Sequence, residues 1–150
     1  MIQIQNDSNL HRDINEKLLK SAIQTTLSEF KQTEVDLTLR LTNDAEMLPL
    51  NRTFRGIDLT TDVLSFNQDF TDPETGRFYL GDIIISIERA LEQAPKQDHT
   101  LNEECTYLAI HGILHLLGFD HDTPQKTAEM WKIQENIFNQ VITKSSEMKK

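Results

Sequence analysis

Residues 79–85, Tyr-Leu-Gly-Asp-Ile-Ile-Ile, restrict the fold of this chain more than any other segment. Three consecutive isoleucines do not fit the alternation of a half-exposed strand and are typical of a strand buried on both faces. Residues 35–41 do alternate between apolar and polar side chains, which predicts a strand with one buried face. Weaker patterns predict two more strands at residues 2–5 and 62–66, and a turn at residues 72–76 leads into the isoleucine strand.

Apolar side chains recur at helical spacing over about residues 12–31 and predict an amphipathic helix there. A shorter helix is expected at residues 44–55 with Asn43 or Asp44 as its N-cap, and Pro49 is expected to shorten or kink it. Further helices are expected at about residues 86–94, 100–117 and 124–142. Because strands and helices segregate, the sequence predicts an α+β fold: one domain with a mixed sheet of about four strands and about five helices.

The last helix is expected to act as scaffold. Its apolar residues lie at helical spacing, and we expect the following to pack in the core: Met130, Trp131, Ile133, Ile137 and Val141. The polar residues 143–150 that follow are expected to form a frayed tail.

The composition limits the classes of protein to consider. Acidic residues outnumber basic ones by 24 to 15, and the net charge of −9 argues against a broad basic surface for nucleic acid. It does not exclude such a substrate, because a bound dication and a few arginines can make one cleft locally positive. Cys105, the single cysteine, excludes an internal disulfide and is expected to be a small buried apolar residue. With neither a secretory signal nor an apolar run that spans a bilayer, we expect a cytoplasmic protein.

Three histidines at the end of the 100–117 helix form the most specific chemical pattern in the chain. His111 and His115 are four residues apart, so on a helix their side chains project from one face, one turn apart. Gly118 lets the chain reverse after the helix, which would return His121 to the same point. The pattern predicts a three-histidine metal site with a fourth position open for water or substrate, as in catalytic zinc sites.

The spacing H-x-x-x-H-x-x-G-x-x-H is that of the metzincin proteases, which carry a glutamate as general base beside the first histidine. Here that position is Gly112, which has no side chain to accept a proton. The pattern therefore predicts metzincin-like metal geometry without peptidase chemistry. A closed structural metal, or histidines that bind no metal, are the alternatives. Zn2+ is the expected ion, one per chain, and Ni2+, copper or cobalt also suit three imidazoles.

Arg55 belongs to a second unusual stretch, residues 51–66, and lies between a helix and a strand. It could present its forked guanidinium to a phosphate or carboxylate, the alternative being a solvated loop arginine without a special role. The segments LNRTFRGIDLTTDVLSF, LGDIIIS and HGILHLLGFDH, in this order and in a chain of this length, resemble the YbeY family. Its members are bacterial single-domain metalloproteins described as endoribonucleases in ribosomal RNA maturation. The resemblance is strong over about residues 48–122.

The resemblance implies a function and its ligands. His111, His115 and His121 match the zinc ligands of the family, and Arg55 matches an arginine held to be important for RNA processing. It implies a zinc-dependent endoribonuclease of single-stranded RNA that acts in 16S rRNA 3′ end processing and in ribosome quality control. The expected partners are ribosomal RNA and ribosomal subunits, with no membrane partner, and we expect a monomer.

Other positions are matched or changed. Asp62 and residues 65–66 match a strand along the cleft, and residues 81–82 match a strand facing the metal. Two departures stand out: Pro49 lies where the family usually continues a helix, and Phe119 replaces the commoner tyrosine.

The expected chemistry is cleavage of an RNA phosphodiester, with the ion polarising a phosphoryl oxygen or activating water and Arg55 stabilising charge on phosphorus. Spacing does not fix the general base, for which Asp62, Asp82 and Asp120 are candidates; Asp120 is favoured instead as a residue that orients a ligand histidine. Three other functions stay open: a metallohydrolase of another substrate such as a peptide, a non-enzymatic ribosome-assembly factor with a structural metal, and a metal-binding module without a nucleic-acid role.

Overall fold

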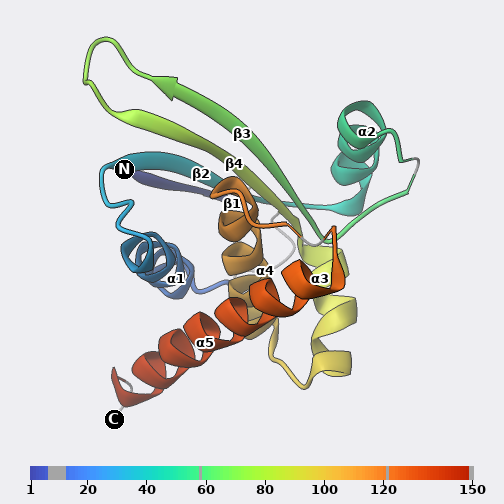
Figure 1. The fold of residues 1–150 in the computed structure, drawn as a ribbon. Helices are drawn as coiled ribbons and strands as arrows, with labels where there is room; N and C mark the ends of the chain where they lie inside the picture. Colours follow the sequence, from blue (N-terminus) through green and yellow to red (C-terminus); the bar gives the residue numbers. More distant parts are fainter. Residues whose placement is uncertain (7–12, 58, 121, 149–150) are drawn as a thin grey trace.

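The computed structural model describes residues 1–6, 13–57, 59–120 and 122–148 (Figure 1). The elements in chain order are β1 (Ile2–Asn6), α1 (Glu16–Glu29), β2 (Val35–Thr42), α2 (Asp44–Arg55), β3 (Val63–Thr71), β4 (Phe78–Ser86), α3 (Ile87–Gln93), a 3-10 turn (Ala94–Gln97), α4 (Leu101–Leu116) and α5 (Pro124–Met148). Over this part of the chain the fold is α+β with a four-stranded sheet and five α-helices, as the sequence predicted.

The sheet is mixed, with strand order β1-β2-β4-β3. β1 pairs with β2 and β2 with β4 in parallel, whereas β3 and β4 form an antiparallel hairpin. Helices α1 and α4 pack on one face, and α2 covers one end of the other face (Figure 1). The hairpin therefore places β3 at the edge of the sheet, beside α4.

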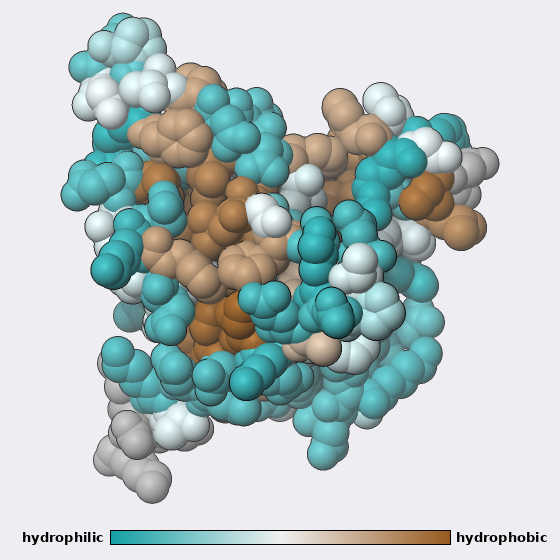
Figure 2. Space-filling view, viewed as in Figure 1, coloured by the Kyte–Doolittle hydropathy of each residue, from teal (hydrophilic) through white to brown (hydrophobic). Residues whose placement is uncertain are grey.

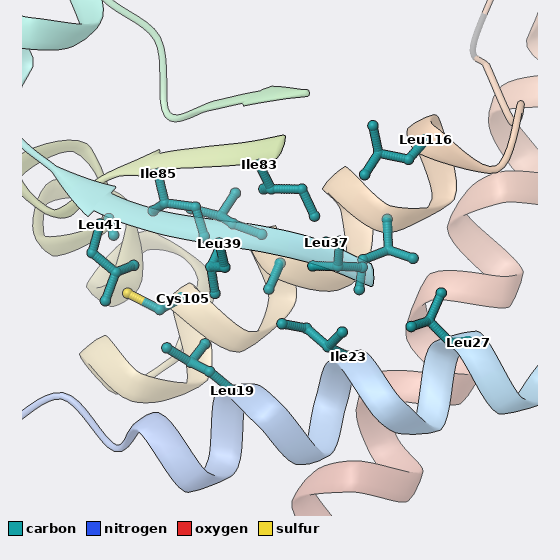
Figure 3. Close-up of a cluster of buried hydrophobic side chains, with 14 of the residues drawn as sticks. Leu19, Ile23, Leu27, Leu37, Leu39, Leu41, Ile83, Ile85, Cys105 and Leu116 are labelled. Atoms are coloured by element: carbon teal, nitrogen blue, oxygen red, sulfur yellow. The ribbon is translucent and has the colours of Figure 1, made fainter. Parts of the chain in front are cut away.

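The isoleucine run of β4 is buried on both faces, as expected. Ile83 and Ile85 are fully buried in the main core, where they meet apolar side chains of α1, β2 and α4 (Figure 3). Ile84 points to the opposite face and packs with Met47 of α2 and Leu64 of β3. The two faces of β4 are thus covered by different helices, which explains why this strand carries no polar alternation over residues 83–85.

Two helix expectations need correction. α1 begins at Glu16, after an N-cap at Asn15 whose side chain accepts a hydrogen bond from Leu18, rather than near residue 12; residues 7–12 lie outside the described part of the chain. α2 runs from Asp44 to Arg55 and is not shortened at Pro49. Pro49 lies on the exposed side of α2, where water can satisfy the carbonyl that its missing N–H leaves unpaired.

α5 also differs from expectation in two respects. It continues to Met148, so residues 143–148 are helical where a tail was predicted. Met130, Ile137 and Val141 are buried against α1 and α4, but Trp131 is 59% exposed, so its predicted core position is wrong. The buried stripe runs through Met130 and Gln134, and Trp131 lies about 100° around the helix from Met130.

Figure 2 shows one face of this fold, and much of that face is hydrophilic. On the face shown in Figure 2, apolar side chains gather in a band between the strands and α5, with polar side chains around it. Within the part of the chain that the structure describes, no helix is both long and apolar enough to cross a membrane.

α4 approaches the sheet closely at Gly112. A Cβ added to Gly112 would lie 2.7 Å from Cγ2 of Ile83 and 3.1 Å from Oγ of Ser65. Ser65 Oγ also donates a hydrogen bond of 3.0 Å to the Gly112 carbonyl, and Asn67 Nδ2 donates one of 2.9 Å to the carbonyl of Leu116. The missing side chain at position 112 therefore has a packing reason: it lets α4 lie directly on β3 and β4.

We expect Gly112→Ala to lower the free energy of unfolding by about 1–3 kcal/mol, because the new methyl group overpacks this contact. A loss of stability would be informative, because replacing glycine by alanine within a helix otherwise raises the free energy of unfolding by about 1 kcal/mol. Urea unfolding of both proteins measures the difference. In an Ile83→Ala background the same substitution should cost less, and an unchanged cost there would contradict the clash with Ile83.

Cys105 lies on α4 in the main core and is fully buried, as the sequence predicted. Burial raises the pKa of its thiol from 9 to about 12. We expect a disulfide reagent at pH 8 to label the folded protein roughly 1,000-fold or more slowly than the chain in denaturant, because both thiolate and access are lost. Absorbance of the released thiolate follows the reaction; rapid labelling of one equivalent in the native protein would contradict this burial.

Candidate functional site

Two of the three predicted ligands meet on α4. Nε2 of His111 and Nε2 of His115 are 3.0 Å apart, with ring centroids 4.6 Å apart and planes at 77°. Both rings are half-buried. Two imidazole nitrogens bound to one tetrahedral zinc ion lie about 3.3 Å apart, so the pair already has nearly the separation that a shared ion requires.

Gln134 of α5 orients the first of these rings. Its Oε1 lies 3.0 Å from Nδ1 of His111, and its Nε2 donates a hydrogen bond of 3.3 Å to the carbonyl of Tyr107. Because the amide nitrogen faces a carbonyl, the amide oxygen must face His111 and accept the Nδ1–H. The lone pair of His111 is therefore left on Nε2, the atom that faces His115, which is the tautomer a metal ligand needs.

The third predicted ligand, His121, lies outside the described residues. The chain before it does change direction as expected: α4 ends at Leu116, Gly118 follows at φ +101°, and the N–H groups of Gly118 and Phe119 bond to the carbonyls of His115 and Leu114. Among the described residues, no three metal-binding side chains come together. The two histidines fit a divalent ion, and the contribution of His121 stays a prediction.

The histidine pair opens into a cleft of about 420 Å³ between α4, the start of β3 and the end of α2. Arg55, the last residue of α2, lines the cleft and is exposed. Gly56 ends the helix in the left-handed conformation, at φ +70°, and turns the chain from Arg55 towards β3. Among the described residues Arg55 has no ion-pair partner, so its guanidinium can bind an anion in the cleft.

β3 forms the wall opposite the histidines. Ser65 and Asn67 of β3, and Asp62 just before it, line the cleft, so this strand runs along it as expected. Phe66 does not line the cleft and packs with Met47 and Leu64 instead. Oδ1 of Asp62 accepts hydrogen bonds from the backbone N–H of Val63 at 2.8 Å and from Oγ1 of Thr61 at 3.3 Å. These bonds hold the carboxylate of Asp62 at the entrance of the strand.

The other two aspartates considered as general bases do not line the cleft. Asp82 follows the alternation of β4 to the face opposite Ile83, where it accepts hydrogen bonds from Tyr79 and Gln68. Asp120 accepts a hydrogen bond from the backbone of Asp122. Of the three candidates, the geometry supports Asp62. Gln134 orients His111, one of the predicted ligands. The orienting role that the sequence favoured for Asp120 stays a prediction.

Gln134 is the site residue that sequence reasoning missed. The sequence does contain an indication of its role, because a single polar residue interrupts the apolar stripe of α5 between Met130 and Ile137. In the structure Gln134 is only 1% exposed. A buried amide needs partners, so its position predicts a bond to a neighbouring helix. The partner of Gln134 depends on how α5 crosses α4, and the local sequence pattern does not predict that crossing.

A model of the family described as endoribonuclease YbeY matches residues 1–142 of the chain. The chain belongs to this family. An endoribonuclease YbeY of Clostridioides difficile is 39% identical over 132 residues, which cover 86% of each chain. One of Chloroflexus aurantiacus is 40% identical over 143 residues, covering 91% of this chain and 92% of the relative. The solution structure of TM1509 from Thermotoga maritima aligns with a TM-score of 0.65 at 27% identity, over 98% of this chain and 93% of the other.

The matches confirm the resemblance to the YbeY family drawn from three sequence segments. In the structure two of these segments form the cleft: residues 50–57 and 59–66 supply the end of α2 with Arg55 and the start of β3, and residues 111–120 supply the histidine pair. The third, residues 80–86, is the buried strand β4 against which α4 packs. This strand does not line the cleft but fixes the position of α4, which carries the two histidines.

We expect Gln134→Leu to lower the affinity for a divalent transition metal by about 10- to 100-fold, because His111 loses the acceptor that fixes its tautomer and orientation. Isothermal titration of the full chain with zinc measures this directly. Gln140→Leu, an exposed glutamine on the same helix, is the matched control and should bind as the wild type does. Unchanged binding by a folded Gln134→Leu variant would show that Gln134 does not position His111.

Proposed function

We propose that this protein is a zinc-dependent endoribonuclease that cuts single-stranded RNA during ribosomal RNA maturation, including 16S rRNA 3′ end processing and ribosome quality control. Membership of a family described as endoribonucleases supports the nuclease activity. The observation that carries the proposal is the shared cleft, into which the histidine pair and Arg55 both open. Its partners would be ribosomal RNA and ribosomal subunits, and the protein would act as a cytoplasmic monomer.

His111 and His115 would hold the ion, with His121 as the third ligand. A bound zinc ion would supply Lewis acidity towards a phosphoryl oxygen and would lower the pKa of water near it. The donor set supports zinc, since neutral imidazole nitrogens suit it and Gln134 leaves the Nε2 lone pair of His111 facing the site. Ni2+ and other divalent transition ions would suit the same donors.

Arg55 would bind the phosphate whose bond is cut. Its planar fork of N–H donors matches two phosphate oxygens, and it gains strength as negative charge builds on them in the transition state. Asp62 would act as general base, because it alone of the three candidate aspartates lines the cleft. Its carboxylate can take the proton of the attacking hydroxyl or water when the nucleophile lies within hydrogen-bond reach.

We expect Arg55→Gln to lower the rate of metal-dependent cleavage of single-stranded RNA by about 100-fold or more, because one donor to the developing charge is lost. Arg52→Gln is the matched control: Arg52 lies one turn earlier on α2 and does not line the cleft, so its removal should change the rate only a few-fold. His115→Ala should abolish the metal-dependent activity. The assay uses purified full-length protein, gel-resolved RNA products and a circular-dichroism check of folding.

Different outcomes favour different functions. Cleavage that persists in both Arg55→Gln and His115→Ala would point to a contaminating nuclease and would overturn the proposal. A folded, zinc-loaded protein that binds ribosomal subunits but cuts no RNA would favour an assembly factor with a structural metal. The peptidase alternative is weakened by the structure, since Gly112 faces Ile83 and leaves no room for the usual glutamate.

A further inference from the structure

A second cleft, of about 480 Å³, adjoins the first on the other side of His111. Asp62, Val63 and His111 line both clefts, so the two are continuous along the edge between α4 and the start of β3. The walls of the second cleft come from α4 and α5. A substrate held at the histidine pair would therefore extend directly into it.

Trp131 of α5 lines this second cleft and is 59% exposed. Its neighbours on the helix are fixed: Met130 is buried in the core, and Gln134 bonds to both Tyr107 and His111. The indole is thus carried by a helix that is tied to the metal site. An exposed tryptophan on rigid backbone offers a large flat apolar face at low entropic cost, which is what a stacking platform requires.

The polar groups of the second cleft differ from those of the first. Its described lining residues include no lysine or arginine, whereas Arg55 lines the first cleft. Glu135 lines it beside Trp131, and one oxygen of Glu135 accepts a hydrogen bond of 2.9 Å from the hydroxyl of Tyr107. Gln97 adds a second polar side chain at the rim. Such a cleft repels phosphate and accepts N–H donors.

Side chains in the interior pack against Tyr107 and fix its position in the wall of the second cleft. The ring of Tyr107 packs edge-on against Phe138 with centroids 5.3 Å apart, and His99 contacts both rings. Glu104, fully buried, bonds to Nδ1 of His99 at 2.8 Å. Tyr107 therefore holds Glu135 in place from a fixed position, and the second cleft is a built feature of the fold.

We propose that the second cleft is a nucleobase subsite, in which Trp131 stacks on the base next to the phosphate held at Arg55 and the histidine pair. Glu135 would accept a hydrogen bond from an N–H donor on the edge of that base, either the amino group of adenine, cytosine or guanine or the N3–H of uracil. This inference rests on the proposed function and deepens it, since it names the part of the RNA that each cleft takes.

The test uses the fluorescence of Trp131, which is the only tryptophan in the chain and therefore reports on this subsite alone. Full-length, zinc-loaded protein is titrated with a short uncleavable single-stranded RNA, and binding is followed in parallel by anisotropy of a dye on the RNA. We expect the indole fluorescence to be quenched with the same Kd that anisotropy gives. RNA that lacks the bases but keeps the backbone should bind without quenching.

Variants measure what the stack contributes. We expect Trp131→Ala to weaken RNA binding by about 5- to 150-fold, the range for loss of one base–aromatic stack. Trp131→Phe should recover most of the affinity. Phe70→Ala is the matched control, because Phe70 is a 51% exposed aromatic residue on β3 that lines neither cleft, and it should bind as the wild type does.

The outcomes separate the subsite from the proposed function. If the RNA binds and is cut, but Trp131 is not quenched and Trp131→Ala binds equally well, the subsite is wrong and the nuclease proposal stands. Quenching by the RNA without bases would also overturn the subsite. If anisotropy detects no binding of RNA by the wild type, the proposed function fails and the subsite with it.

Discussion

The contact between α4 and the sheet at Gly112 is the constraint on which the site depends. A side chain there would collide with Ile83, and the Gly112 carbonyl accepts a hydrogen bond from Ser65, so helix and edge strand are held at a fixed distance. His111 and His115 flank this glycine and project into the space that remains beside β3. In this chain, the packing that positions the two histidines is incompatible with the glutamate that a metzincin peptidase needs at the same position.

Gln134 extends this dependence to α5, because burial of an unpaired amide would cost about 1–3 kcal/mol. Its oxygen accepts from His111 and its nitrogen donates to the Tyr107 carbonyl, so the cost is offset only when α5 lies in its native place against α4. The orientation of His111 is thus coupled to tertiary packing far along the chain. α5 takes part in the site itself, where the sequence indicated only a scaffold.

The sequence correctly predicted those features that depend on neighbouring residues within one helix or strand. Alternation gave the strand at residues 35–41, three isoleucines gave the doubly buried β4, and the i, i+4 spacing brought His111 and His115 within 3.0 Å. The wrong predictions concern side chains whose orientation depends on packing between separate helices and strands. Trp131 is apolar and lies on α5, but the face of α5 that is buried against the core is the one that contains Gln134. The family resemblance placed Asp82 on a strand facing the metal, but α4 packs on the other face of β4, and only the assembled sheet defines that face.

The acidic composition limits how such a molecule can hold RNA. With a net charge of −9 it cannot rely on many phosphate contacts, which supply most of the affinity of basic RNA-binding proteins. One arginine, one dication and one stacked base would have to carry the binding, and a base must be unpaired and splayed out before an indole can stack on it. In the proposed function, a preference for single strands would then follow from the second cleft and not from charge. The acidic surface would repel the phosphates of either form of RNA, but only a single strand could offset this repulsion by stacking an unpaired base on Trp131.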